Sequence, residues 1–463
     1  MAHGKYDNRH RRRKRNNSGI GVVVALTALL LILAVLLFAK SCTPQTPDIT
    51  TADTTESSGT NQTDDSTEDS GTEDPGPKEP YVVSSASVGV TGDLLMHLPV
   101  IDAAAIGNGK YDFSENFKYM KKYYERFDFM VANLETTLAG TAMPYHGYPN
   151  FNCPDDLIDG LLGAGVDMLL TANNHSYDTY QEGMLRTLKV LEEKGMYALG
   201  TRKSKDLPTY MVKDLNGIKI GMVCYTYDTG STSDGRKSLN GNSPMTKTAS
   251  ELINTFNYST TDKFYKELKD TLSAMKNEGA EATIVFIHWG NEYELKPTTS
   301  QTKIAKELCE LGVDVIVGGH PHVVQPFETL TSSTGHTTHC IYSLGNALSN
   351  QNRNSLENTT SNAIYTEDGM VFGVEFKKWS DGTVKISSIS LLPTWVNKEW
   401  RNSKNVYNII PLDTAVEAWN CYNVSKESRT YDSYKRTMSV VGKGLNETLE
   451  DMGLTKVPLT FGN

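Results

Sequence analysis

The chain has 463 residues, with 45 Lys and Arg against 55 Asp and Glu and a formal net charge of −10. This length allows two or three domains, and the acidic balance argues against a nucleic-acid binder, which needs basic surface. The charge is unevenly distributed, because residues 1–40 carry +7, residues 41–80 carry −9 and residues 81–463 carry −8. Three compositionally different segments are therefore joined in series.

The first segment predicts a membrane anchor. Residues 1–19 contain five consecutive basic residues, and residues 20–39 contain no charged side chain. A helix of twenty residues spans about 30 Å, the thickness of the hydrocarbon core of a lipid bilayer. The positive-inside rule then predicts a single-pass cell-membrane protein with a cytoplasmic N-terminus and an extracytoplasmic C-terminal domain. One alternative is a cleaved signal peptide, whose apolar stretch is normally about 7–15 residues long. The other is lipidation at Cys42, although Lys40 fits the cleavage site poorly.

The next segment, residues 40–80, is rich in Thr, Ser, Pro and acidic side chains. Such a composition cannot bury enough apolar surface to fold, and it predicts a disordered acidic linker. The main domain is predicted over residues 81–395, and residues 396–463 are predicted to form a C-terminal helical extension. The cysteines of residues 81–463 are scattered without a C-x-x-C pair, which argues against a thiolate zinc site or a redox motif.

Strands and helices are predicted to alternate along the main domain. The expected strands cover 82–90, 127–134, 166–170, 210–215, 218–225, 283–287 and 313–317, another opens at Ile341, and a final hairpin covers 370–377 and 383–391. The expected helices cover 179–194, 262–278 and 302–311, with two more over 412–422 and 431–452. This alternation predicts an α/β fold with one or two sheets covered by helices.

Metal-binding side chains follow five successive predicted strands. They are Asp93, Glu135, Asn174 with His175, His288, and His320 with His322. Taken alone, His288 is more simply a structural histidine and Glu135 a turn cap. Five cases in series predict a site, because the carboxyl ends of the strands are where α/β proteins assemble their sites. The remaining loop-like histidines, His146, His336 and His339, are predicted to be surface groups.

The segment Gly318-Gly319-His320-Pro321-His322 is the most specific of these motifs. Two glycines permit a tight backbone path, and the two imidazoles point at one centre if the chain turns there. Oxygen and imidazole donors without thiolate suit one or two divalent cations such as Mn, Fe or Zn. A carboxylate between two such clusters could bridge two cations about 3.5–4 Å apart. No P-loop, nucleophile-elbow or dinucleotide motif is present.

Together these motifs resemble the CapA family of capsule-synthesis and poly-γ-glutamate-biosynthesis proteins, related to calcineurin-like metallophosphoesterases. The resemblance covers about residues 84–395 and rests on Thr91-Gly92-Asp93, Ala132-Asn133-Leu134-Glu135, Ala172-Asn173-Asn174-His175, His288-Trp289-Gly290 with Glu292, the segment from Gly319 to Pro326, and Leu392-Pro393-Thr394-Trp395. It implies a four-layer αββα sandwich, with metals at the strand ends.

The resemblance also implies roles for individual residues. Asp93 and His322 would bind a first metal, Glu135 would bridge, and Asn174, His288 and His320 would bind a second, with His175 beside them as general acid or electrostatic stabiliser. Phosphoesterases typically carry a His two residues after the first Asp, where this chain has Leu95. His97, four residues after Asp93, is an open candidate. The position of the first metal therefore has one ligand fewer than in typical phosphoesterases.

The function that the resemblance implies is the synthesis, export or anchoring of an anionic polymer such as poly-γ-glutamate by a membrane-anchored, extracytoplasmic protein. The expected partners are the lipid bilayer, the polymer and its membrane synthase subunits, with no nucleic acid. Any reaction would be metal-assisted hydrolysis or transfer at a phosphoryl or acyl centre. The alternative is a non-catalytic, metal-stabilised partner subunit of a membrane polymer synthase complex.

Overall fold

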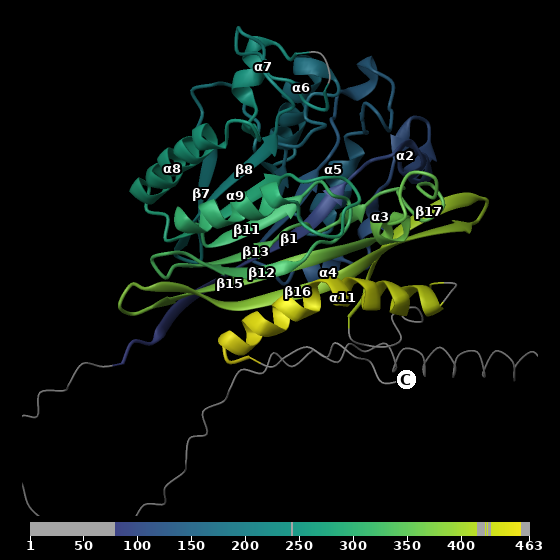
Figure 1. Cartoon of the computed structure of the whole chain (residues 1–463). Coiled ribbons are helices and arrows are strands. Elements are labelled where there is room, and N and C mark those ends of the chain that lie inside the picture. Colours follow the sequence, from purple (N-terminus) through teal and green to yellow (C-terminus); the bar gives the residue numbers. More distant parts are fainter. Residues whose placement is uncertain (1–78, 242–243, 414–421, 423, 425–426, 455–463) are drawn as a thin grey trace, which may run out of the picture. The chain divides into compact units, whose positions relative to one another are not determined.

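The computed structural model describes residues 79–241, 244–413, 422, 424 and 427–454, and its two main sheets face each other (Figure 1). The first sheet has the order β17-β16-β15-β1-β4-β5-β6, with β14 paired to β1. Its strands are β17 (Lys404–Pro411), β16 (Val384–Arg401), β15 (Asp368–Trp379), β1 (Val82–Leu94), β4 (Phe129–Leu134), β5 (Met168–Leu170), β6 (Tyr197–Leu199) and β14 (Asn346–Leu348).

The second sheet has the order β12-β13-β11-β10-β8-β7, with β9 paired to β8. Its strands are β12 (Phe327–Thr331), β13 (Thr337–Ile341), β11 (Val315–Gly319), β10 (Ala282–His288), β8 (Ile218–Tyr227), β7 (Tyr210–Leu215) and β9 (Thr255–Phe256). The hairpin between β7 and β8 turns at Asn216-Gly217, where both residues have positive φ, as a type I′ turn requires. A separate ribbon pairs β2 (Ala105–Gly107) with β3 (Lys110–Tyr111).

Helices cover the outer faces of the two sheets. On the first sheet lie α2 (Leu98–Ala104), α3 (Ser114–Phe117), α4 (Lys121–Tyr124) and α5 (Asp156–Gly163), with α6 (Tyr180–Glu193) packing partly on the same face. On the second lie α8 (Thr261–Asn277) and α9 (Thr299–Glu310). The remaining helices are α7 (Lys247–Leu252), α11 (Glu427–Asp451) and the 3-10 turns η1 (Gly140–Ala142) and η2 (Ala363–Glu367).

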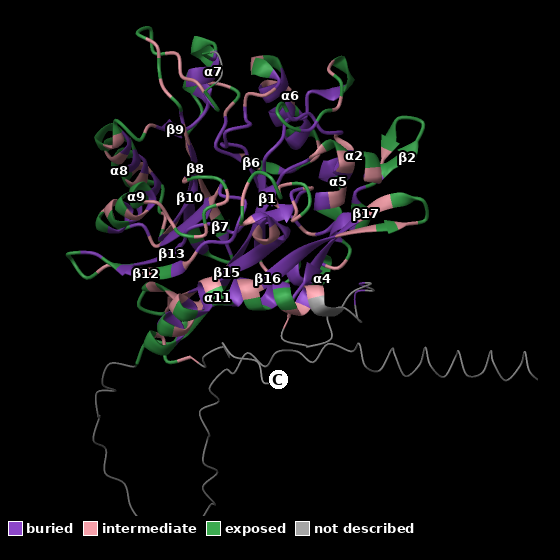
Figure 2. Cartoon of the chain, turned by 45° about the vertical axis from the view of Figure 1, so that its right-hand side comes forward, coloured by how far each residue is buried: buried purple, intermediate pink, exposed green. Residues whose placement is uncertain are grey.

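Side-chain alternation along the strands explains the layers. In β10, Ile284 and Phe286 pack into the core between the sheets, whereas Val285 and Ile287 pack under the helices on the outer face. A strand that is buried on both faces reads as a continuous apolar run, as parallel strands between helices do. Figure 2 shows buried strands inside and exposed surface on the outward sides of α8 and α11. The predicted α/β fold is therefore confirmed as a sandwich of sheets and helices.

The neighbouring strands β1, β4 and β5 are parallel, as are β8, β10 and β11. Their carboxyl ends therefore lie together within each sheet. Helix α11 packs against β12, β15 and β16, and its side chains Val441 and Leu445 join the core between the sheets. Figure 1 shows α11 running along one side of the sandwich.

Several local predictions were wrong. The strand expected to open at Ile341 instead ends there. Its start was not predicted, because Thr337 to His339 are polar and do not show the apolar pattern of a buried strand. The boundary placed at Trp395 falls inside β16, and residues 396–411 form strands of the first sheet rather than helix. His339 is 7% exposed instead of lying on the surface, because it stacks on Phe327 within the second sheet.

The predicted membrane segment 20–39, the linker 40–80 apart from its last two residues, and most of the helix predicted over 412–422 lie outside the described residues. Within the part that is described, no helix is long and apolar enough to cross a bilayer.

Candidate metal centre

The predicted metal ligands meet where the carboxyl ends of the two sheets face each other. From the first sheet, Asp93 lies in β1 and Glu135 directly follows β4. From the second sheet, His288 ends β10. The other members lie in loops just after strands, namely Asn174 after β5 and His320 and His322 after β11. All six side chains are 4% exposed or less.

Three groups of possible ligand atoms form in the described part of the chain, and Glu135 belongs to two of them. Asp93, Glu135 and His322 make the first group, and Glu135, His288 and His320 make the second. Within each group the ligand atoms lie within 4.8 Å of one another. Asn174 adjoins the second group, because its Oδ1 is 2.7 Å from His288 Nε2. The structure therefore brings all six residues together, while their individual roles stay predictions.

Two buried atoms of the site have no hydrogen-bond partner. They are Oε1 of Glu135 and Nδ1 of His320. The Glu135 oxygen lies 3.5 Å from His288 Nε2 and 3.7 Å from His322 Nε2. Leaving a buried polar atom unpaired costs about 1–3 kcal/mol, so such atoms require an explanation. A cation would satisfy both, and these residues fit a divalent metal.

The protonation of the histidines suits this interpretation. Burial, followed by the neighbouring His288 and His322, holds the pKa of His320 well below its usual value, so the imidazole is neutral as a metal ligand must be. For His322, burial lowers the pKa, but Glu135 and Asp93 outweigh it and raise the pKa to about 9. A proton and a cation therefore compete for His322.

Three hydrogen-bonding partners contact the Asp93 carboxylate. Its Oδ1 accepts a hydrogen bond from Asn133 Nδ2 at 2.8 Å. Its Oδ2 accepts from the His320 backbone N–H at 3.2 Å and lies 3.2 Å from His322 Nδ1. Burial raises the pKa of Asp93, but the contacts with His322 lower it below its ordinary value. The carboxylate is therefore ionised and oriented.

The backbone after β11 is strained where it presents the two histidines. His320 has φ +97° and His322 has φ +55°, which are sparsely populated conformations for residues with side chains. The Asp93 carboxylate holds the first of them through the His320 N–H. Strain of this kind persists where the surrounding structure holds it, and it gathers at functional sites.

His175 forms a buried pair with Asp178, which the sequence analysis missed. His175 Nδ1 donates to Asp178 Oδ2 at 2.8 Å, and the same oxygen accepts from the Phe151 N–H at 2.7 Å. Burial lowers the pKa of His175, but Asp178 outweighs it and raises the pKa above its ordinary value. The only sequence signal was an acid three residues after His175.

An amide that the sequence analysis also missed supports the first group. Asn346 Oδ1 lies 3.1 Å from His322 Nδ1, and its Nδ2 donates to the Thr366 carbonyl at 3.0 Å. Asn346 opens β14, which pairs with β1 at Asp93. No signal in the sequence marks it, because this pairing joins segments more than 250 residues apart.

The open candidate His97 does not join either group. Its Nδ1 lies 3.1 Å from the Leu95 carbonyl, and its ring packs edge-on against Phe151. Leu95 itself is buried. Within the described residues, the first group therefore has three His, Asp or Glu ligands. The exposed Glu292 forms the third group of possible ligand atoms with His320 and His322; the sequence analysis named it within a motif but gave it no role.

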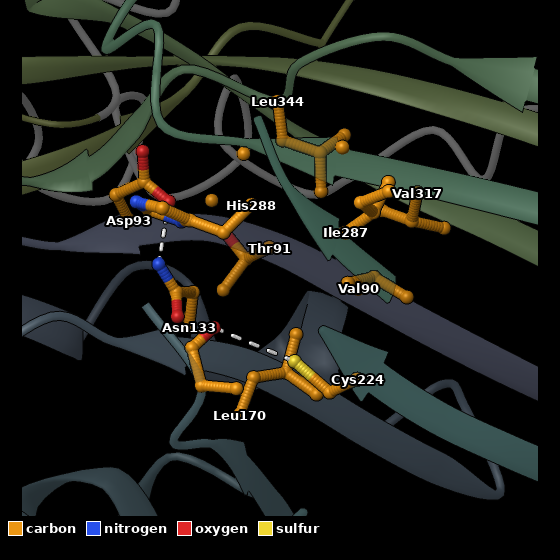
Figure 3. A pocket seen from close by; sticks show the side chains of 14 residues that line it. Val90, Thr91, Asp93, Asn133, Leu170, Cys224, Ile287, His288, Val317 and Leu344 are labelled. Carbon is orange, nitrogen blue, oxygen red and sulfur yellow. Dashed lines mark hydrogen bonds between the residues drawn. The ribbon is translucent and has the colours of Figure 1, made fainter. Parts of the chain in front are cut away.

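A cavity of about 20 Å³ lies beneath the site. Figure 3 shows Asp93, Asn133 and His288 at one end of it and apolar side chains such as Val90 and Val317 at the other. A water molecule needs about 10–15 Å³ of such space, so the cavity has room for a water molecule and not for a larger ligand.

Comparison with known proteins identifies the family. Residues 87–351, more than half of the chain, match the family described as "Bacterial capsule synthesis protein PGA_cap". The chain belongs to this family. The matched PGA_cap region contains every residue of the two ligand groups and both residues of the His175–Asp178 pair.

Two curated relatives are similar to the chain. The "Capsule biosynthesis protein CapA" of Bacillus anthracis is 25% identical over 267 residues, which are 57% of this chain and 59% of that protein. The "PGA biosynthesis protein CapA" of Bacillus subtilis (strain 168) is 22% identical over 316 residues, 64% of this chain and 71% of that protein. The chain thus spans less than two thirds of the first relative.

Proposed function

We propose that this protein is a membrane-anchored, extracytoplasmic capsule-synthesis protein whose metal centre acts in the synthesis, export or anchoring of an anionic polymer such as poly-γ-glutamate. The family and the names of its relatives support a role with such a polymer. The observation that carries the metal centre is the buried, unpartnered Glu135 Oε1 between two groups of ligands. Residues 81–463 carry a net charge of −8, so a cation would also give an anionic ligand a point of attraction.

The proposed chemistry is hydrolysis or transfer at a phosphoryl or acyl centre. Asp93, Glu135 and His322 would hold one cation, and Glu135, Asn174, His288 and His320 a second. When bound, such cations act as Lewis acids and lower the pKa of a bound water. His175 would give a proton to the leaving group from Nε2, because Asp178 occupies Nδ1. Asp178 would hold the ring in place and favour the protonated form that a general acid needs.

The proposed location follows from the N-terminal composition. Residues 20–39 would form the membrane anchor, with the basic residues before them in the cytoplasm. Residues 40–80 would tether the described domain on the extracytoplasmic side. Partner subunits of a membrane polymer synthase are part of the proposal.

A second function is favoured by one observation. Leu95 places a buried apolar side chain where phosphoesterases typically have a metal-binding histidine, and His97 does not replace it. A first position with so few ligands suits a protein that keeps its metal for stability. The alternative is therefore a non-catalytic partner subunit of a polymer synthase.

The test compares turnover with metal content in the purified full chain. Wild type, His175→Ala and His320→Ala are assayed on phosphodiester and γ-glutamyl substrates, and bound metal is measured by elemental analysis. We expect His175→Ala to keep its metal and lose about 10²–10⁴-fold in rate, the usual contribution of a general acid. His320→Ala should lose metal and turnover together.

Each other outcome counts against a specific part of the proposal. Turnover that survives in His175→Ala removes the role of that residue. A fully metallated wild type without turnover on either substrate class favours the non-catalytic alternative. Metal content that is unchanged in His320→Ala contradicts the metal centre itself.

A further inference from the structure

The second ligand group is supported by residues that lie outside every motif singled out in the sequence. The two contacts come from Tyr227, the last residue of β8, and from Asn240 in the loop that follows. The first group differs, because its amide supports Asn133 and Asn346 belong to the buried strands β4 and β14. The two halves of the metal centre are therefore held by different parts of the fold.

Tyr227 contacts one of the two ring nitrogens of His320. Its hydroxyl oxygen lies 3.3 Å from His320 Nε2, whereas His320 Nδ1 is buried without a partner. A neutral imidazole carries one proton, and the nitrogen without it is the one that binds a metal. The contact with Tyr227 occupies Nε2, so Nδ1 is the nitrogen left for a cation. Binding a cation there requires the ring proton on Nε2, with the phenol oxygen as its acceptor.

Asn240 fixes the orientation of the Asn174 amide. Its Nδ2 donates at 3.0 Å to the backbone carbonyl of Asn174, which can only accept. The Oδ1 of Asn240 must then face a donor, and Asn174 Nδ2 fills that role at 2.8 Å. The Asn174 side chain is thereby turned so that its Oδ1 faces His288 Nε2. Asn240 is exposed and has φ +52°, so this clamp lies at the surface.

We propose that Tyr227 and Asn240 are positioning residues that set the occupancy of the second metal position. The inference rests on the metal centre of the proposed function. Groups that orient metal ligands are typically worth about 10–100-fold in metal affinity. Tyr227 and Asn240 both lie in the segment 227–240. We therefore infer that this segment sets the metal affinity of the second position and leaves that of the first unchanged.

The experiment titrates Mn²⁺ into the metal-stripped full chain by isothermal titration calorimetry. His288→Ala identifies the second position as the binding event that it removes. Tyr227→Phe and Asn240→Ala should each weaken that event by about 10–100-fold, with the other event unchanged. Asn240→Asp keeps the acceptor for Asn174 Nδ2 and should lose less than Asn240→Ala. The melting temperatures of the metal-free variants should equal that of wild type.

Two matched substitutions serve as controls. Tyr180→Phe removes the hydroxyl of an exposed tyrosine, and Asn277→Ala removes an exposed amide at the end of α8. Both should bind Mn²⁺ as wild type does. If wild type shows a single event, that event must weaken in Tyr227→Phe and Asn240→Ala for the inference to stand.

The contrary outcomes separate this inference from the proposed function. Wild-type binding in both Tyr227→Phe and Asn240→Ala, with one event lost in His288→Ala, overturns the positioning roles and leaves the metal centre intact. Lower affinity that comes with a lower melting temperature of the metal-free protein shows a structural role instead. Full binding in His288→Ala overturns the metal centre and the inference with it.

Discussion

Gly319 lies so close to the ligand groups that it has no room for a side chain. A Cβ atom there would lie 2.9 Å from Asp93 Oδ1 and 3.6 Å from His288 Nδ1. Gly319→Ala must displace the Asp93 carboxylate or β11, and we expect the affinity for Mn²⁺ to fall by at least about tenfold, as for other disturbed metal sites. Calorimetric titration of the metal-stripped protein measures this change.

Gly163→Ala is the matched control for that substitution. Gly163 lies in α5, and a Cβ added there meets no atom within 4 Å. Its affinity for Mn²⁺ should stay at the wild-type value, and the protein should gain up to about 1 kcal/mol in stability, because alanine suits a helix better than glycine. Equal affinities in the two variants would show that the packing of Gly319 against Asp93 does not affect metal binding.

The site residues differ in how far the sequence could predict them. Residues that follow strands, such as Glu135 and His288, could be predicted to converge, because the carboxyl ends of parallel strands share an edge. Tyr227 also ends a strand, but the predicted strand stopped two residues before it. Asn240 and Asn346 could not be predicted, because loop closure and long-range strand pairing bring them to the site.

At the scale of single elements, one buried ion pair joins α11 to the first sheet. Arg436 contacts both carboxylate oxygens of Asp368 at 2.7 and 2.8 Å, and Ser433 donates to the same carboxylate at 2.6 Å. Arg436→Ala leaves a buried charge without its partner, which costs about 3–5 kcal/mol. We expect this loss in the free energy of unfolding at pH 7, measured by urea denaturation.

The pH dependence of that loss provides an internal check. Burial raises the pKa of Asp368 to about 6 even with Arg436 present, and removing the guanidinium raises it further. At pH 5 the carboxyl group in Arg436→Ala is protonated and needs no counter-charge. The loss in the free energy of unfolding relative to wild type should therefore be smaller at pH 5 than at pH 7. Lys435→Ala, which breaks an exposed pair with Asp432, should cost about 1 kcal/mol or less at either pH. A similar small cost for Arg436→Ala would mean that α11 does not depend on this pair.

At the scale of the whole molecule, the alternation of strands and helices predicted the α/β class but not the limits of the first sheet. Residues 396–411 were assigned to a helical extension, yet they complete β16 and form β17. Val396 and Trp395 pack on opposite faces, so this stretch lacks the polar and apolar alternation of a half-exposed strand. The parallel pairing of β14 with β1 is equally invisible, because local sequence does not encode contacts across such separations.

The ligand groups draw on both sheets, so a bound cation should stabilise the described domain as a whole. Asp93 and Glu135 belong to the first sheet, and His288 and His320 to the second. A cation at about 100 times its Kd adds about 2.7 kcal/mol to the folded state, which raises Tm by about 5–10 °C at about 2–4 °C per kcal/mol. Scanning calorimetry of the full chain should therefore show one transition that moves down by this amount after chelation and returns when Mn²⁺ is added. His320→Ala lacks a ligand of the second position only, so its Tm should start below that of wild type and respond less to chelator. A wild-type Tm that ignores chelation and added Mn²⁺ would show that no cation links the two sheets.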